Sequence, residues 1–189
     1  MSSSKTPPLG YALLGLLHLK PSSGYGLRKI FSSTSMKTYS DSPGAIYPAL
    51  RRLEKHGLIH GRIEQGAGLR RRQVFRLTSK GLAELRKWIT SPVTREDLVH
   101  GPGLIMLRFA FSEGAIGTQA TLQLLHSFEA ALEPHLQALG EELHAMKAVV
   151  PISARLAFEC GIRGTECLLE WTRYASSIYE EGNGKKSEL

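Results

Sequence analysis

The sequence predicts a mainly α-helical fold, with one small β-hairpin in the N-terminal half and a helical C-terminal half. Apolar residues recur every three to four positions through most of the chain, and only residues 58–64 and 73–77 have the pattern of strands. Residues 1–90 hold 16 Lys and Arg against 4 Asp and Glu, whereas residues 91–189 hold 8 against 13. Such asymmetry is typical of a nucleic-acid-binding half joined to a half with another role.

The domain boundaries follow from these changes in composition. We expect flexible tails at residues 1–8 and 182–189, an N-terminal domain over residues 9–91 and a helical dimerisation domain over residues 92–181. The N-terminus lacks a signal peptide, and the longest apolar run is too short to span a bilayer. We therefore expect a cytoplasmic protein that does not use a membrane.

The first predicted helices run from Leu9 to Leu19 and from Gly24 to about Phe31. Ser23 can accept backbone N–H bonds as the N-cap of the second helix. Residues 32–41 are polar and are predicted to form an irregular link.

The third predicted helix has a signal at each end and two different faces. Ser42 can serve as its N-cap, Pro43 suits its first position, and Gly57 supplies the left-handed residue that ends it. One face is apolar and consists of Ile46, Leu50 and Leu53, whereas the opposite face carries Tyr47, Arg51, Arg52 and Lys55. A short helix of this kind has the shape and charge to lie in a DNA major groove.

The two strands follow this helix and enclose a glycine-containing tip that ends in Arg70, Arg71 and Arg72. Arginines at such a tip can reach phosphates or the minor groove beside the third helix. Thr78 then begins a fourth helix that runs to about Ile89. Helices and hairpin in this order predict a winged helix-turn-helix domain.

The predicted DNA-binding residues are Ser42, Gly44, Ala45, Tyr47, Arg51, Arg52, Lys55, Arg70, Arg71, Arg72, Tyr25 and Lys29. The basic members would neutralise phosphates of an operator in double-stranded DNA. Base recognition would depend on Tyr47, the Ala45 methyl group, Ser42 or DNA shape. Two alternatives stay open: a winged-helix module that binds a protein or RNA, and an architectural DNA binder without a ligand.

Several N-terminal motifs resemble those of the PadR family of transcriptional regulators. They are Tyr11–Leu17, Ser23–Leu27, Gly44–Glu54, His56–Ile59 and Leu77–Gly81. The resemblance implies a dimeric repressor, often released from its operator by a small molecule, with C-terminal helices that dimerise. The sequence departs from the family pattern at Gly26, at Phe75 and in its arginine-rich wing tip.

The C-terminal half is predicted to be helical and to form a homodimer. A capping box at Thr94–Asp97 precedes a helical run interrupted near Pro102, and a long helix from Thr118 contains Pro134, which should kink or split it. A last helix spans residues 152–181. We expect apolar seams on these helices to be buried across a two-fold axis. The predicted dimerisation residues are Leu125, Phe128, Leu132, Leu136, Leu139, Leu143, Leu156, Tyr174 and Ile178.

No pattern in the sequence predicts catalysis. The seven histidines are scattered, and neither a Cys–His metal spacing nor a phosphate-binding loop occurs, so we expect no enzyme activity, no cofactor and no metal. Cys160 and Cys167 are too far apart along a helix for a disulfide and are predicted to be small core residues. Trp88 and Trp171 are candidates for binding a small aromatic effector, although large aromatic residues more often belong to the core.

Overall fold

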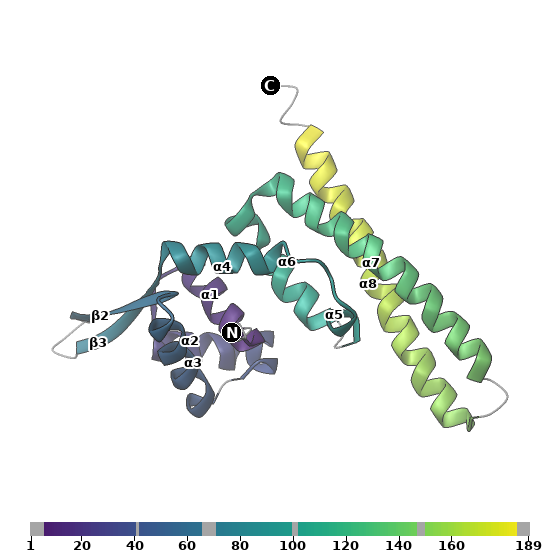
Figure 1. The fold of residues 1–189 in the computed structure, drawn as a ribbon, viewed down its shortest axis with the longest axis horizontal. Helices are drawn as coiled ribbons and strands as arrows, with labels where there is room; N and C mark the ends of the chain where they lie inside the picture. Colours follow the sequence, from purple (N-terminus) through teal and green to yellow (C-terminus); the bar gives the residue numbers. More distant parts are fainter. Residues whose placement is uncertain (1–5, 41, 66–70, 100–101, 147–149, 185–189) are drawn as a thin grey trace. The chain divides into compact units, whose positions relative to one another are not determined.

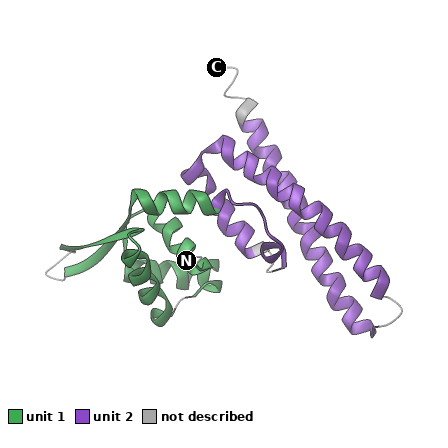
Figure 2. Ribbon diagram, in the orientation of Figure 1, with its two compact units in different colours: residues 1–88 green, residues 89–189 purple. Residues whose placement is uncertain are grey.

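The computed structural model describes residues 6–40, 42–65, 71–99, 102–146 and 150–184, which are mostly helical (Figure 1). The chain divides into two compact units, residues 1–88 and 89–189 (Figure 2). This division lies close to the predicted boundary between residues 91 and 92. Within the described ranges, no helix is both long and apolar enough to cross a membrane.

The first unit has the predicted order of helices and strands. Its elements are α1 (Pro8–Leu19), β1 (Ser22–Ser23), α2 (Gly24–Ser33), the 3-10 helix η1 (Ser35–Thr38), α3 (Pro43–Lys55), β2 (Ile59–Gln65), β3 (Arg71–Leu77) and α4 (Ser79–Ile89). The link after α2 was predicted to be irregular, but it contains the 3-10 helix η1. Thr34 caps this helix, because its Oγ1 accepts the Met36 N–H. The wing is antiparallel, with Ile59 opposite Leu77 and Gln65 opposite Arg71.

Two features of this unit place α3. The short strand β1 pairs with β3 on the side away from β2, which joins the start of α2 to the hairpin. The α1 helix is buried along most of its length, and both α3 and β3 pack against it. Because α1 has neighbours on several sides, it is apolar nearly all round rather than amphipathic.

The second unit consists of α5 (Arg95–Val99), α6 (Pro102–Ile116), α7 (Thr118–Met146) and α8 (Ile152–Gly184). The predicted capping box is present: Asp97 Oδ2 accepts the Thr94 N–H at 2.8 Å, and Thr94 Oγ1 accepts the Asp97 N–H at 3.3 Å. Pro102 opens α6, where a missing N–H costs nothing. The α7 helix continues through Pro134, so the predicted alternative of two separate helices was wrong.

A buried arginine organises the start of the second unit. Arg108 on α6 donates hydrogen bonds to the carbonyl of Ile89, at 3.1 Å from Nε and 2.8 Å from Nη2, and to the carbonyl of Ser91. Its guanidinium also lies 5.3 Å from the centre of the Phe128 ring and 3.8 Å from Asp97. Burial lowers the pKa of Arg108, and the charge of Asp97 opposes this shift.

The structure corrects the assignment of apolar faces on α7 and α8. Leu125, Phe128 and Leu132 are buried inside the chain, because α7 packs against α6 and α8. They therefore offer no surface to a second copy, contrary to their predicted role in dimerisation. Cys160 and Cys167 were predicted to be core residues, but both are exposed. They follow the exposed Leu156 by 4 and 11 positions, a spacing that puts all three residues on one face of α8.

Candidate nucleic-acid interface

Both ends of α3 are fixed as the sequence predicted. The Ser42 hydroxyl accepts the Gly44 N–H at 3.2 Å, so the predicted N-cap is confirmed. At the other end Gly57 has a φ of +71°, and its N–H bonds the Glu54 carbonyl while the Leu58 N–H bonds the Leu53 carbonyl, each at 2.9 Å. This is a Schellman motif, which ends the helix sharply and directs the chain into β2.

The underside of α3 is held by apolar packing and by one carboxylate. Ile46, Leu50 and Leu53 are buried. Glu54 Oε1 accepts the N–H of Gly61 on β2 at 2.8 Å, which connects the helix to the wing. The only acidic side chain of α3 is therefore engaged in a structural bond rather than placed among its basic residues.

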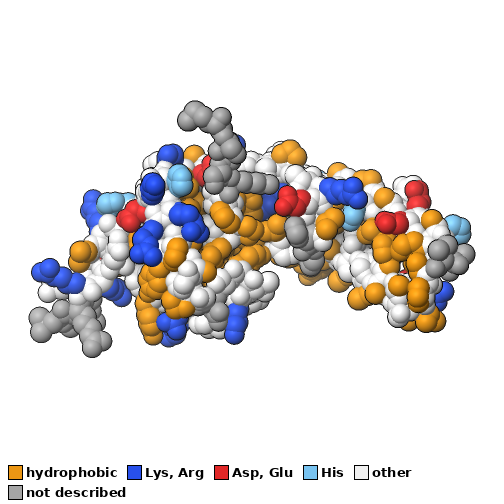
Figure 3. All heavy atoms as spheres, turned by 60° about the horizontal axis from the view of Figure 1, so that its bottom comes forward, with side chains coloured by type: hydrophobic (Ala, Val, Ile, Leu, Met, Phe, Trp, Pro, Cys, Tyr) orange, Lys and Arg blue, Asp and Glu red, His pale blue; other side chains and the backbone are white. Residues whose placement is uncertain are grey.

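The outer face of α3 presents free positive charge. The side chains of Arg51, Arg52 and Lys55 are exposed, and none has a hydrogen-bond or ion-pair partner within the part of the chain that the structure describes. We call these three residues the α3 basic face. Lys and Arg side chains are prominent on the first unit, at the left of Figure 3.

Two tyrosines lie near the N-terminal ends of α2 and α3. Tyr47 is 40% exposed, and its ring lies on Gly24, since a Cβ at Gly24 would be 2.5 Å from Tyr47 Cε1. Tyr25 is largely exposed, as are Ser42 and Gly44, whereas Ala45 is half-buried. The first turn of α3 thus has little side-chain bulk, so its backbone can approach a surface closely.

The wing contributes further exposed arginines. Arg71 and Arg72 are exposed at the start of β3, whereas Arg70 lies outside the described residues. Arg76 forms an ion pair with Glu64 at 3.0 Å, so part of the positive charge of the wing is balanced locally.

Sequence reasoning missed one candidate on α2. Lys29 is exposed as predicted, and so is its neighbour Arg28. Arg28 lies three positions after the exposed Tyr25, and residues at this spacing share a helix face, so the periodicity of α2 was the available signal.

The two tryptophans lie in different compact units. Trp88 stacks on Tyr11 with ring centres 4.3 Å apart, and Trp171 meets Phe109 edge to face at 5.0 Å. Neither lines the cavity beside α7 and α8 in the second unit or the one beside α1 and α3 in the first. Their proposed role in effector binding stays a prediction. No group of three His, Cys, Asp or Glu side chains is placed to hold a metal ion within the described ranges.

Comparison with known proteins finds one matching family model and one curated relative. Residues 13–87 match the model of the transcriptional regulator PadR-like family. The chain is 35% identical over 82 residues to the negative transcriptional regulator PadR of Bacillus subtilis (strain 168), and this match covers 43% of the chain and 44% of that relative. The match thus spans less than half the length of this curated relative.

Two solved structures align with most of the chain, both with TM-scores below 0.5. A crystal structure of Bacillus subtilis PadR in complex with operator DNA has 20% sequence identity and a TM-score of 0.43, with 92% of this chain and 99% of that chain covered. A crystal structure of the same Bacillus subtilis protein in complex with p-coumaric acid has 20% identity and a TM-score of 0.38, with 91% and 98% covered.

Proposed function

We propose that this chain, whose residues 13–87 match the PadR-like family of transcriptional regulators, is a member of that family that binds an operator in double-stranded DNA and regulates transcription. We propose further that it acts as a homodimeric repressor and that a small molecule releases it from DNA. Catalysis is not part of the proposal, because the family is one of transcriptional regulators.

The α3 basic face is the observation that carries this proposal. Three cations stand exposed on a helix whose opposite side is buried and whose carboxylate is engaged elsewhere. Cations without protein partners can contact phosphates without first breaking an ion pair. Each phosphate contact releases a counterion, so the affinity should fall with rising salt concentration.

Base recognition would involve few side chains. Gly44 has no side chain, and the Ser42 hydroxyl already accepts the Gly44 N–H. The Ser42 hydroxyl, which keeps its own proton to donate, Tyr47 and the Ala45 methyl group are then the groups that can contact base edges. An alanine methyl can contact the methyl group of thymine. We propose that DNA shape and phosphate positions contribute much of the sequence preference.

An apolar stripe on α8 supports dimerisation. Leu156, Tyr174 and Ile178 are 52%, 64% and 49% exposed, and they lie on the face of α8 turned away from α7. We call these three residues the α8 stripe. Tyr174 and Ile178 lie one turn apart on this face and Leu156 lies five turns earlier, so a second copy packed along α8 would remove all three from water. A dimer would place two α3 helices in major grooves about 34 Å apart.

The test is a titration of the purified protein against a fluorescent duplex from the DNA that flanks its own gene, at several salt concentrations. Wild type should bind in dilute buffer. Arg51→Ala should lower the affinity and reduce the slope of log affinity against log salt by about two, because the homodimer loses one phosphate contact in each subunit.

Lys87→Ala is the matched control, since Lys87 is an exposed cation of the same unit on α4. It should leave the affinity and the salt slope near their wild-type values. If the Arg51→Ala variant binds like wild type, α3 is not part of the DNA-binding surface. If the wild-type protein binds RNA in preference to the duplex, the RNA-binding alternative is favoured.

A further inference from the structure

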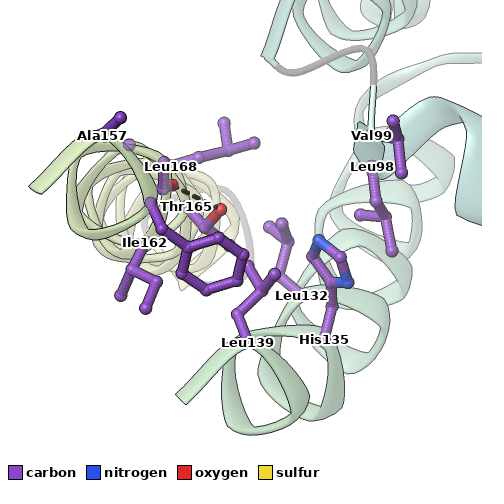
Figure 4. Close-up of a pocket in the computed structure, with 12 residues that line it drawn as sticks. Leu98, Val99, Leu132, His135, Leu139, Ala157, Ile162, Thr165 and Leu168 are labelled. Atoms are coloured by element: carbon purple, nitrogen blue, oxygen red, sulfur yellow. Dashed lines mark hydrogen bonds between the residues drawn. The ribbon is translucent and has the colours of Figure 1, made fainter. Parts of the chain in front are cut away.

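The second unit contains an apolar cavity that three helices of one chain line and that is partly open to solvent. Its volume is about 450 Å³, within the range of small-ligand sites in proteins. Figure 4 shows Ile162 and Thr165 of α8 on one side, Leu98 and Val99 of α5 on the other, and His135 and Leu139 of α7 between them. A cavity with this lining favours an apolar occupant.

His135 is the side chain that can offer a hydrogen bond to a molecule in the cavity. The other polar side chain of the lining, Thr165, donates its proton within α8, from Oγ1 to the Gly161 carbonyl at 3.1 Å. His135 is half-buried, and its ring nitrogens have no hydrogen-bond partner in the part of the chain that the structure describes. An imidazole can donate a hydrogen bond to a carboxylate, sulfonate or phenolic oxygen.

Two glycines keep the α8 wall open. Gly161 and Gly164 line the cavity, and a Cβ at either would meet no atom within 4 Å. Glycine inside a helix costs about 0.5–1 kcal/mol relative to alanine. No close contact requires glycine at either position. The effect that the two glycines share is that they leave open space at the cavity wall.

We propose that this α5–α7–α8 cavity binds a small, largely apolar molecule that carries one acidic group, with His135 as the partner of that group. The cavity lies on the side of α8 that faces α7, whereas the α8 stripe lies on the opposite side, so a dimer through the stripe would leave the cavity available. As the effector site, the cavity deepens the proposed function and rests on it; as a binding site, it does not depend on DNA.

The α5 helix connects the cavity with the buried arginine. Leu98 and Val99 line the cavity, and the preceding residue, Asp97, lies 3.8 Å from Arg108. A bound molecule would therefore contact the same short helix that faces the guanidinium group. Arg108 in turn holds the carbonyl of Ile89, the last residue of α4.

The experiment measures binding without DNA, so its failure is separate from failure of the DNA-binding proposal. The probe is 8-anilinonaphthalene-1-sulfonate, which has an apolar aromatic body and one anionic group, and its fluorescence is titrated against the full-length chain. Wild type should bind one probe per chain. Gly161→Leu should weaken binding at least about tenfold, because the new side chain fills the space.

Gly140→Leu is the matched control, because Gly140 lies on α7, does not line the cavity and also has open space around it. It should bind the probe as wild type does. Circular dichroism checks that both variants are folded, and Gly161→Ala, which adds only a methyl group, is a milder variant for the same comparison.

A second pair of measurements tests the role of His135. His135→Leu should weaken the anionic probe about tenfold, the value of one hydrogen bond to a charged group, while binding of the uncharged analogue N-phenyl-1-naphthylamine stays unchanged. Wild-type chain that binds no probe, or Gly161→Leu that binds it normally, would overturn the proposal. If Gly161→Leu loses the native oligomeric state and Gly140→Leu keeps it, the cavity is a contact between subunits, and the proposal is also overturned.

Discussion

At the scale of single residues, Tyr11 shows how a polar group is accommodated in the core of the first unit. Its ring stacks on Trp88, and its hydroxyl donates a hydrogen bond to Glu84 at 3.1 Å. Burial raises the pKa of Tyr11 to about 12, and the charge of Glu84 adds to the shift. The phenol therefore stays neutral in the folded chain at pH values where an unfolded tyrosine ionises.

This shift predicts a loss of stability in strong base. The folded pKa is above the unfolded value of 10.0, so the contribution of Tyr11 is complete below pH 10 and is lost as the pH rises toward 12. Two pKa units correspond to at most about 2–3 kcal/mol of unfolding free energy. Urea unfolding at pH 9 and at pH 11 should show a smaller decrease for Tyr11→Phe than for wild type. Equal decreases in the two proteins would mean that Tyr11 titrates normally.

Which residues could be predicted from the sequence depended on whether their partners were close in the chain. Ser42, Gly57 and Thr94 act on backbone groups within a few positions, so their roles were readable. Arg108 holds the carbonyls of Ile89 and Ser91, which precede it by 19 and 17 positions. Nothing in the local pattern distinguishes such a buried arginine from an exposed one.

At the scale of elements, the first turn of α4 is fixed against the end of α3. The Thr78 N–H and the Thr78 hydroxyl lie within bonding distance of the Leu58 carbonyl, at 3.1 and 3.0 Å, and Thr78 Oγ1 accepts the Gly81 N–H at 3.0 Å. Lys80 Nζ adds a bond to the His56 carbonyl at 2.8 Å. These contacts hold the C-terminal end of α3, the hairpin and α4 together.

The tight approach at this joint predicts opposite effects for two glycine substitutions. A Cβ at Gly81 would lie 2.0 Å from the Leu58 carbonyl oxygen, so Gly81→Ala should destabilise the fold by about 1–3 kcal/mol. A Cβ at Gly140 meets nothing within 4 Å, so Gly140→Ala should stabilise it by about 0.5–1 kcal/mol. Urea unfolding at one protein concentration compares them, and destabilisation by both would show that α7 is strained at Gly140.

The helical periodicity predicted most elements and both faces of α3, but it could not say what covers the apolar faces of α7 and α8. The α7 seam was correctly found to be apolar, yet Leu125, Phe128 and Leu132 are covered by helices of the same chain. The sequence spacing is the same whether the covering helix comes from the same copy or another one. For the same reason the exposure of Cys160 and Cys167 was missed.

At the scale of the whole molecule, the two units differ in charge and in what they expose. The first unit presents the α3 basic face, whereas the second presents the α8 stripe. A DNA-binding surface and a self-association surface on separate units would allow each to be altered without removing the other.

The α8 stripe predicts a dimer that one charge can weaken. Tyr174→Glu should shift the equilibrium toward monomer by at least about tenfold, because a carboxylate would be buried without a partner. Sedimentation at several protein concentrations measures the shift, and operator affinity should fall with it. Gln123→Glu adds the same charge at an exposed position of α7 outside the stripe and should leave the dimer intact. A Tyr174→Glu variant that sediments like wild type would place the subunit contact elsewhere.

The exposed thiols of Cys160 and Cys167 lie on the side of α8 that carries the stripe. They give the native chain two built-in reporters that need no engineered labelling position. If copies associate through that side, the rate at which a thiol-specific reagent modifies these sulfurs should slow as the protein is concentrated. The protein should be purified under reducing conditions, because exposed thiols on copies that are not associated can form intermolecular disulfides in air.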